Sequence, residues 1–274
     1  MMRNQIKEIP AENFDFEKIL SLVKNLQADN SPREKVLVIL GATSAGKSSL
    51  AIKLAEIFQT EIISADSMAV YKNFDIGTAK PTEDELKKIP HYLINILEPE
   101  EKFSVMEFVR LAKKIIAEIN SRGKIPIIAG GTGLYIQALL EGYKFSEDKT
   151  KSRESFFAET GELVYNALVV GLTMNRTDLY KKIDERTAQM FSAGLVEEVQ
   201  KLLSAGVKKN SQAMFGIGYK EVVEYLQGNL TLEETISKVS QATRNFAKRQ
   251  LTWYRRMSYI KFFNISQKVG ESST

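Results

Sequence analysis

The sequence contains no cysteine and only one histidine, His91, among its 274 residues. The missing thiols exclude disulfide bonds, thiolate metal sites and a cysteine nucleophile, and one histidine cannot build a multi-histidine metal site. No apolar run reaches the roughly 18 to 20 residues that a membrane span needs. Acidic residues interrupt the apolar stretches near the N-terminus, which argues against a secretory signal. We expect a cytoplasmic protein that does not bind membranes.

The remaining composition is that of a folded chain. Hydrophobic residues make up 43% of the sequence and charged residues 26%, so extensive disorder is not expected. The formal net charge is +4, and a basic balance of this size indicates an anionic partner without requiring one.

Short apolar runs without polar alternation recur along the first two thirds of the chain. They cover residues 36–40, 61–65, 125–129 and 167–171, and segments with helical spacing separate them. Strands that are apolar on both faces are typical of a parallel sheet covered by helices on both sides. The sequence therefore predicts an open α/β fold.

The organisation of the chain follows from these patterns. Residues 1–34 form a polar lead-in with one amphipathic helix, 35–173 the α/β core, 174–262 a mostly helical part packed on the core, and 263–274 a tail. Within the core, the polar segment 143–165 is interpreted as a surface connection.

A glycine-rich loop follows the first apolar run and matches the phosphate-loop pattern G-x-x-x-x-G-K-[ST]. It consists of Gly41, Ala42, Thr43, Ser44, Ala45, Gly46, Lys47 and Ser48. In such a loop the backbone N–H groups face phosphate oxygens, the lysine reaches the terminal phosphate, and the serine hydroxyl is offered to Mg²⁺. The motif predicts a diphosphate or triphosphate site and does not say whose phosphate is bound. With this motif, the expected α/β fold is of the P-loop NTPase type.

Three further polar residues stand where apolar runs end. Asp66 follows the second run, Thr132 the third and Arg176 the fourth. Ligands of open α/β sheets bind outside the carboxyl ends of the strands, so we expect Lys47, Asp66, Thr132 and Arg176 to line one cleft. For Asp66 three roles stay open: a metal or water ligand, a general base, or a helix N-cap.

Two other features near this cleft have two interpretations each. The pair Gly130–Gly131 is either a second backbone turn that faces an anion or a plain turn between strand and helix. Arg176, with the basic residues that follow it, is either a phosphate clamp or part of a solvated helix face.

The stretch 244–261 contains basic and aromatic residues and no acidic one. On a helix, the aromatic residues Phe246, Trp253 and Tyr254 fall on one side, which we interpret as core. The other side is cationic and carries Arg244, Lys248, Arg249, Arg255 and Arg256. This side is either a surface for nucleic-acid phosphates or an ordinary solvated face.

Taken together, these motifs resemble the tRNA dimethylallyltransferase (isopentenyl-tRNA transferase) family. The matching stretches, in family order, are GATSAGKS at 41–48, ISADSMAVY at 63–71, DIGTAKP at 75–81, PH at 90–91, GGTGLY at 130–135, RTDLY at 176–180, GIGYKE at 216–221 and TRNFAKRQLTW at 243–253. A phosphate loop alone is widely shared, whereas this set is specific.

The resemblance implies transfer of a dimethylallyl group from dimethylallyl diphosphate, held with Mg²⁺, to the exocyclic amine of the adenine next to the 3′ side of a tRNA anticodon. It implies that Asp66 is the base, that Thr132 donates a hydrogen bond near the reacting centre, and that Arg176 holds the diphosphate. It places against the tRNA the residues Asp66, Ser67, Met68, Ala69, Gly216, Ile217, Gly218, Tyr219, Lys220 and Glu221. We assign Arg244, Lys248 and Arg255 to the anticodon stem-loop and expect a monomer.

The sequence departs from the family pattern in several places. Family members usually insert a helical subdomain after the GGTGLY helix, where this chain has only the short segment 143–165. Ala69 stands where the family usually has glutamine, and Ala42 where proline is common. Two alternatives therefore stay open, namely prenyl transfer to a free adenine nucleotide, and a phosphate-loop protein that does not transfer a prenyl group, such as a small-molecule kinase.

Overall fold

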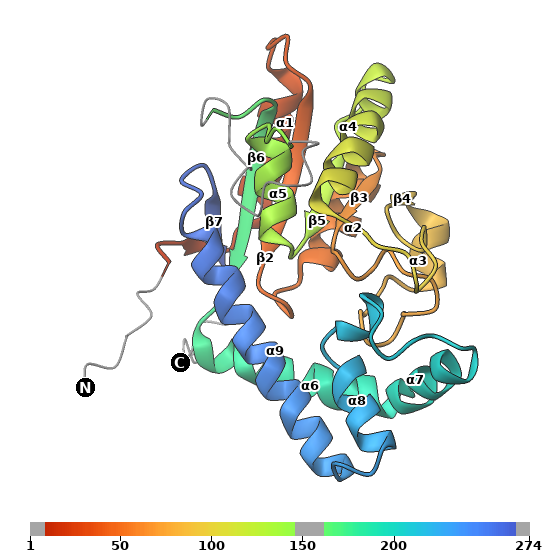
Figure 1. Ribbon diagram of the computed structural model, residues 1–274. Coiled ribbons are helices and arrows are strands. Elements are labelled where there is room, and N and C mark those ends of the chain that lie inside the picture. Colours follow the sequence, from red (N-terminus) through yellow and green to blue (C-terminus); the bar gives the residue numbers. More distant parts are fainter. Residues whose placement is uncertain (1–8, 146–161, 267–274) are drawn as a thin grey trace, which may run out of the picture.

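The computed structural model describes residues 9–145 and 162–266, which form a parallel sheet with helices around it (Figure 1). The described strands are β1 (Glu12–Asn13), β2 (Lys35–Gly41), β3 (Ile62–Ala65), β4 (His91–Tyr92), β5 (Ile127–Gly130), β6 (Asn166–Thr173) and β7 (Lys261–Asn264). Their order across the sheet is β1-β7-β6-β2-β5-β3-β4, and every pair is parallel. The predicted α/β sheet is confirmed, and its four apolar runs are β2, β3, β5 and β6.

Helices cover both faces of the sheet, as Figure 1 shows. They are α1 (Phe16–Ala28) and α2 (Lys47–Phe58) on one face, and α4 (Val105–Ser121) and α5 (Gly133–Leu140) on the other. Side chains alternate along a strand, so Leu37 and Ile39 of β2 pack with α1 and α2, whereas Val36, Val38 and Leu40 pack with α4 and α5. The short helix α3 (Glu83–Lys88) lies between β3 and β4 in the sequence.

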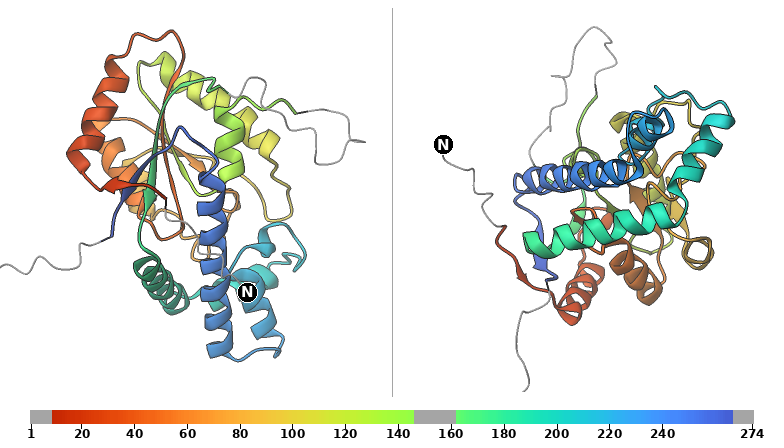
Figure 2. Two further views of the ribbon diagram at one scale, coloured as in Figure 1. Left: turned by 90° about the vertical axis from the view of Figure 1, so that its left-hand side faces the viewer. Right: turned by 90° about the horizontal axis from the view of Figure 1, so that it is seen from below.

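The helical part lies beyond the carboxyl ends of the strands, below the sheet in Figure 1. It contains α6 (Arg176–Ser192), α7 (Leu195–Ser204), a 3₁₀ turn (Ala213–Phe215), α8 (Tyr219–Leu226) and α9 (Leu232–Tyr254). Seen from below, α6 (green) and α9 (blue) run alongside each other (Figure 2, right). These helices close the end of the sheet at which a phosphate loop and strand-end side chains are expected.

The two ends of the described chain meet at one edge of the sheet. The lead-in contains α1 and also β1, which pairs with β7 through Glu12 and Phe263. The predicted tail at 263–274 begins inside β7, so its boundary differs from the structure. Strands of two and four residues at an edge have no periodicity of their own, because pairing with a distant strand defines them.

Most of the predicted surface connection, residues 146–161, lies outside the described residues. Its flanks pack on the core: the N–H of Val164 donates to the carbonyl of Leu140 (2.9 Å), and Tyr165 is buried. Within the described ranges, no helix has both the length and the apolar character that are needed to cross a bilayer.

Candidate active site

The phosphate loop connects β2 to α2 at the carboxyl edge of the sheet. Gly46, just before the helix, has a φ of 73°, a left-handed conformation that favours glycine. The Lys47 side chain folds back over the loop, and its Nζ donates a 2.8 Å hydrogen bond to the carbonyl of Ala42. Thr43, Lys47 and Ser48 line a cavity of about 120 Å³, which we call the inner cavity.

Lys47 is a buried cation with a second cation nearby. The pKa of Lys47 is lowered to about 8, first by burial and then by the positive charge of Arg186, while the negative charge of Asp66 opposes both effects. Burial also lowers the pKa of Arg186, and Asp66 again opposes this. Because two desolvated cations repel each other, an anion bound between them would be stabilised strongly.

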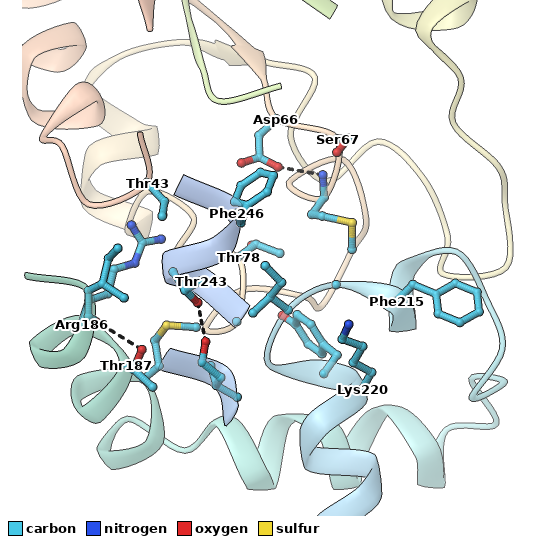
Figure 3. Close-up of a pocket in the computed structure, with 18 of the residues that line it drawn as sticks. Thr43, Asp66, Ser67, Thr78, Arg186, Thr187, Phe215, Lys220, Thr243 and Phe246 are labelled. Carbon is cyan, nitrogen blue, oxygen red and sulfur yellow. Dashed lines mark hydrogen bonds between the residues drawn. The ribbon is translucent and has the colours of Figure 1, made fainter. Parts of the chain in front are cut away.

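A second, larger cavity of about 330 Å³ adjoins the first, and we call it the outer cavity. Both cavities are lined by Thr43, Asp66, Thr78, Arg186 and Phe246. Figure 3 shows these side chains converging from the phosphate loop, the end of β3, α6 and α9. The two spaces therefore form one chamber, and Asp66 and Arg186 lie at its junction.

The two cavities differ in chemistry. The inner cavity has the basic and hydroxyl side chains Lys47, Ser48, Ser64 and Lys80 on its wall. The outer cavity combines apolar side chains, among them Met68, Ile183, Met190 and Ile217, with hydroxyl and basic ones that include Thr243, Lys220 and Arg249. The inner cavity suits a phosphorylated group, and the outer cavity suits a small hydrocarbon and a planar ring.

Asp66 follows β3 directly and faces this chamber. Its Oδ1 accepts a 2.8 Å hydrogen bond from the N–H of Met68, which fixes the carboxylate in a tight turn. The next helix along the chain, α3, is capped by Thr82, so Asp66 is not a helix N-cap. The roles of metal or water ligand and of general base both remain compatible with its position.

Thr132 lies at the start of α5 and lines the outer cavity. Its Oγ1 accepts a 3.1 Å hydrogen bond from the N–H of Ser67, the residue after Asp66. This bond joins the ends of β3 and β5, as the strand-end argument predicts. Lys47, Asp66 and Thr132 thus converge on the same chamber.

The Gly130–Gly131 turn connects β5 to α5 beside the chamber. Both residues line the inner cavity. The carbonyl of Gly131 also accepts hydrogen bonds from Gln250 Nε2 and from the hydroxyl of Tyr254, each 2.9 Å long. A Cβ on Gly131 would lie 2.3 Å from Gln250 Nε2, so a larger residue here would force the Gln250 amide to move.

Arg176 does not join the other three residues, which corrects the expectation of four. It is the exposed first residue of α6, lines neither cavity, and holds its guanidinium carbon 5.0 Å from the centroid of the Tyr180 ring. The position beside Lys47 belongs to Arg186, ten residues later on α6. The end of a strand determines the position of only the first residues of the following helix. Ten helical residues advance the chain by about 15 Å, so a residue later on the helix can reach the chamber when the first one does not.

The DIGTAKP segment enters the chamber because a carboxylate on α7 holds it. Glu198 accepts hydrogen bonds from the N–H groups of Asp75 (3.0 Å), Ile76 (2.8 Å) and Gly77 (3.2 Å). It also accepts a 2.7 Å hydrogen bond from the hydroxyl of Tyr219. This clamp presents Thr78 to both cavities.

Lys80, at the end of the same segment, lines the inner cavity. Its ammonium group donates to Asp75 Oδ1 (2.8 Å) and to the carbonyl of Tyr71, and only 3% of its side chain is exposed. Burial lowers the pKa of Lys80, and its bond with Asp75 opposes this. Lys80 adds a third positive charge on the wall of the inner cavity.

The residues expected to contact tRNA separate into three groups. The outer cavity is lined by Ser67, Met68, Gly216, Ile217, Tyr219 and Lys220, whereas Ala69 is buried and lines the inner cavity. Gly218 and Glu221 line neither cavity, because the buried Glu221 carboxylate accepts the N–H of Gly218 (2.8 Å) and caps α8. Both residues thus have a capping role, and their tRNA contact stays a prediction.

The predicted stem-binding residues Arg244, Lys248 and Arg255 also lie outside both cavities. Arg244 and Lys248 lie beside the Tyr180 ring, with their charged groups 5.6 and 5.9 Å from its centroid. Arg255 is exposed and follows the end of α9.

The sequence analysis missed several residues of the chamber. Phe246 was assigned to the core with Tyr254, and Tyr254 is indeed buried, but Phe246 lines both cavities. Two polar residues could have indicated that this side of the helix faces a cavity. Thr243 and Gln250 flank Phe246 at helical spacing, on the side that was interpreted as core. Thr78 and Gln250 lie within the matched stretches 75–81 and 243–253 but were not singled out there, and Arg186 lies outside every matched stretch.

Comparisons with known proteins agree with this site. A family model described as IPP transferase matches residues 69–163 and 154–257. The tRNA dimethylallyltransferase of Carboxydothermus hydrogenoformans is 40% identical, and the match covers 88% of this chain and 95% of that protein. The aligned stretch spans 297 positions, more than the 274 residues here, so that relative carries segments which this chain lacks.

Solved structures of tRNA-modifying transferases are also similar to this chain. The full-length tRNA isopentenylpyrophosphate transferase of Bacillus halodurans is 36% identical, with a TM-score of 0.75 over 85% of this chain and 90% of that one. A eukaryotic dimethylallyltransferase acting on tRNA is 25% identical, with a TM-score of 0.74 over 84% and 74% of the two chains. The resemblance seen in the motifs is thereby confirmed, and the chain belongs to the IPP transferase family.

Proposed function

We propose that this protein transfers the dimethylallyl group of dimethylallyl diphosphate to the exocyclic amine of an adenine in tRNA, next to the 3′ side of the anticodon. One observation carries this proposal: Asp66 and Arg186 lie where an inner cavity lined by Lys47 and Lys80 joins an outer cavity whose wall includes Met68, Ile183 and Met190. A prenyl diphosphate has the same division into a charged and an apolar half. Family membership and the relatives named above support the same reaction.

The diphosphate would bind in the inner cavity. The N-terminus of α2 and the cations Lys47 and Arg186 face this space, and Lys80 lines it. A diphosphate leaves readily when the charge that grows on it is neutralised, and desolvated cations do this more strongly than water does. The five-carbon group would then extend into the outer cavity, toward Phe246 and Met68.

The residues of the inner cavity also fit Mg²⁺. Ser48 and Asp66 line it, and among the described residues no group of three or more carboxylate or imidazole ligands is present. Mg²⁺ commonly takes few protein ligands and completes its coordination with substrate phosphates and water. We propose that Ser48 holds it there, where it would supply further charge neutralisation for the leaving diphosphate.

Asp66 would act as the general base. The bond between the allylic carbon and the diphosphate oxygen breaks, the bond from that carbon to the adenine nitrogen forms, and a proton of the amine passes to the Asp66 carboxylate. The hydrogen bond from Met68 orients the carboxylate without consuming both oxygens. Thr132, whose Oγ1 lies beside Ser67, would hydrogen-bond near the reacting nitrogen.

The acceptor would reach Asp66 through the outer cavity. An adenine inside a stacked loop must swing out to enter such a space, and Gly216, Ile217 and Lys220 lie on its wall. A monomer as the working unit is part of this proposal. A cytoplasmic location follows from a tRNA substrate.

Label transfer tests the proposal. The purified protein with Mg²⁺ and labelled dimethylallyl diphosphate is given unmodified tRNA, tRNA whose target adenine is replaced by guanine, or AMP. We expect label in the first tRNA alone. Transfer to AMP alone would make the protein a free-nucleotide prenyltransferase. Absence of transfer, with ATP consumed instead, would favour a kinase.

A further inference from the structure

Three cationic side chains surround one aromatic ring beside the chamber. The charged groups of Arg176, Arg244 and Lys248 lie 5.0, 5.6 and 5.9 Å from the centroid of the Tyr180 ring. Arg176 and Tyr180 belong to α6, and the other two belong to α9. We call these four residues the Tyr180 cluster.

The positive charge of this cluster is only partly balanced. Asp184 lies 3.4 Å from Arg244, whereas within residues 9–145 and 162–266 no acidic group makes an ion pair with Arg176 or Lys248. A cation gains from an aromatic face, but this gain is small at an exposed site. Three like charges around one ring therefore favour the binding of an anion between them.

The ring forms a rigid floor beneath the three cations. Tyr180 packs against the apolar cluster on the α1 and α2 side of the sheet, and its hydroxyl is buried without a hydrogen-bond partner among the described residues. The polar end of the ring therefore points away from water. Two guanidinium groups and one ammonium group are left to present N–H donors, a combination that suits phosphate oxygens.

The cluster and the outer cavity share the same two helices. Ile183 and Arg186 follow Tyr180 on α6, and Thr243, next to Arg244 on α9, lines the outer cavity. The view from below shows these helices running alongside each other (Figure 2, right). A strand that sends one base into the outer cavity would carry its backbone along this pair of helices.

We propose that the Tyr180 cluster binds a backbone phosphate of the RNA strand whose adenine enters the outer cavity. This inference rests on the proposed function. The cluster lines neither cavity, so it is not part of the donor's diphosphate site. The phosphate of a free adenine nucleotide has the same chemistry, and the experiment below separates the two sources.

The test compares two double variants on the same background. Arg176→Gln with Lys248→Gln removes two charges from the cluster. The control, Lys181→Gln with Lys182→Gln, removes two charges from exposed positions of α6 that do not belong to the Tyr180 cluster. Lys181 makes only a long ion pair with Glu185. The affinity for unmodified tRNA is measured at several salt concentrations, together with kcat at saturating tRNA.

We expect the cluster variant to bind tRNA about tenfold more weakly. The slope of log affinity against log salt concentration should fall in magnitude by about one, because fewer counterions are released on binding when a phosphate contact is lost. Its kcat at saturating tRNA stays unchanged. The charge-preserving pair Arg176→Lys with Lys248→Arg retains the slope. The control pair at Lys181 and Lys182 leaves affinity and slope near those of the unaltered protein.

Equal effects of the cluster and control pairs would overturn the proposal, as would an unchanged slope. A raised KM for AMP with unaltered tRNA binding would assign the cluster to a free nucleotide and overturn it too. Binding is measured without turnover, so a protein that transfers no prenyl group but binds RNA through the cluster would refute the proposed reaction and leave this inference standing.

Discussion

The backbone N–H of Thr43 in the phosphate loop donates a 2.9 Å hydrogen bond to Oε1 of Gln250, which lies on α9, 207 residues further along the chain. The other end of the same amide donates to the carbonyl of Gly131. One buried side chain therefore ties together the loops that follow β2 and β5. The relative position of the two turns that line the inner cavity depends on a helix near the end of the chain.

Replacing Gln250 by leucine should destabilise the fold and disturb the donor site. The change leaves the Thr43 N–H and one bond to the Gly131 carbonyl unsatisfied, and each buried unpaired group costs about 1–3 kcal/mol. Denaturant unfolding should show a loss of about 2–4 kcal/mol, and the KM for the prenyl diphosphate should rise. Gln241→Leu, at an exposed position of the same helix, serves as control. Equal stability of the two variants would contradict this role.

Asp66→Asn should lower the transfer rate by about a hundredfold or more, with little change in tRNA affinity, because the amide cannot take the proton of the acceptor amine. The amide oxygen can still accept the N–H of Met68, so the turn is expected to persist. Single-turnover transfer and equilibrium tRNA binding measure the two effects separately. An unaltered rate would remove Asp66 from the role of base.

Arg186 and Arg176 give a direct comparison within one helix. Arg186→Gln removes a desolvated cation from the wall of the inner cavity and should reduce kcat/KM for the prenyl diphosphate by about a hundredfold. Arg176→Gln should leave the KM for this donor unchanged, since its side chain lies outside both cavities. Steady-state kinetics with varied donor at saturating tRNA distinguishes them. The reverse ranking would restore the assignment made from the sequence.

Glu198→Gln should loosen the segment that carries Thr78 and Lys80. A carboxylate can accept all four hydrogen bonds from Asp75, Ile76, Gly77 and Tyr219, whereas an amide turns an NH₂ group toward donors. Amide hydrogen exchange should therefore accelerate at residues 75–77, and the unfolding free energy should fall by about 1–3 kcal/mol. Glu197→Gln, at the exposed neighbouring position, should do neither. Unchanged exchange at residues 75–77 would argue against the clamp.

Local patterns were sufficient for the sheet and for part of the chamber. The apolar runs predicted β2, β3, β5 and β6, because strands buried on both faces have a recognisable composition. The phosphate loop stands between β2 and α2 as its motif requires. The short strands β1 and β7 at one side of the sheet were missed, because each exists only through its pairing with a distant partner.

The sequence by itself determined the family, the phosphate loop, and the positions of Asp66 and Thr132, because each of these residues directly follows a strand that the pattern identifies. Only the tertiary structure decided that Arg186 and not Arg176 faces Lys47, and that Phe246 lines the chamber. The physical reason is the direction of a helix: its first residue is tied to the preceding strand, whereas every later residue is placed by the packing of α6 and α9 against the rest of the fold.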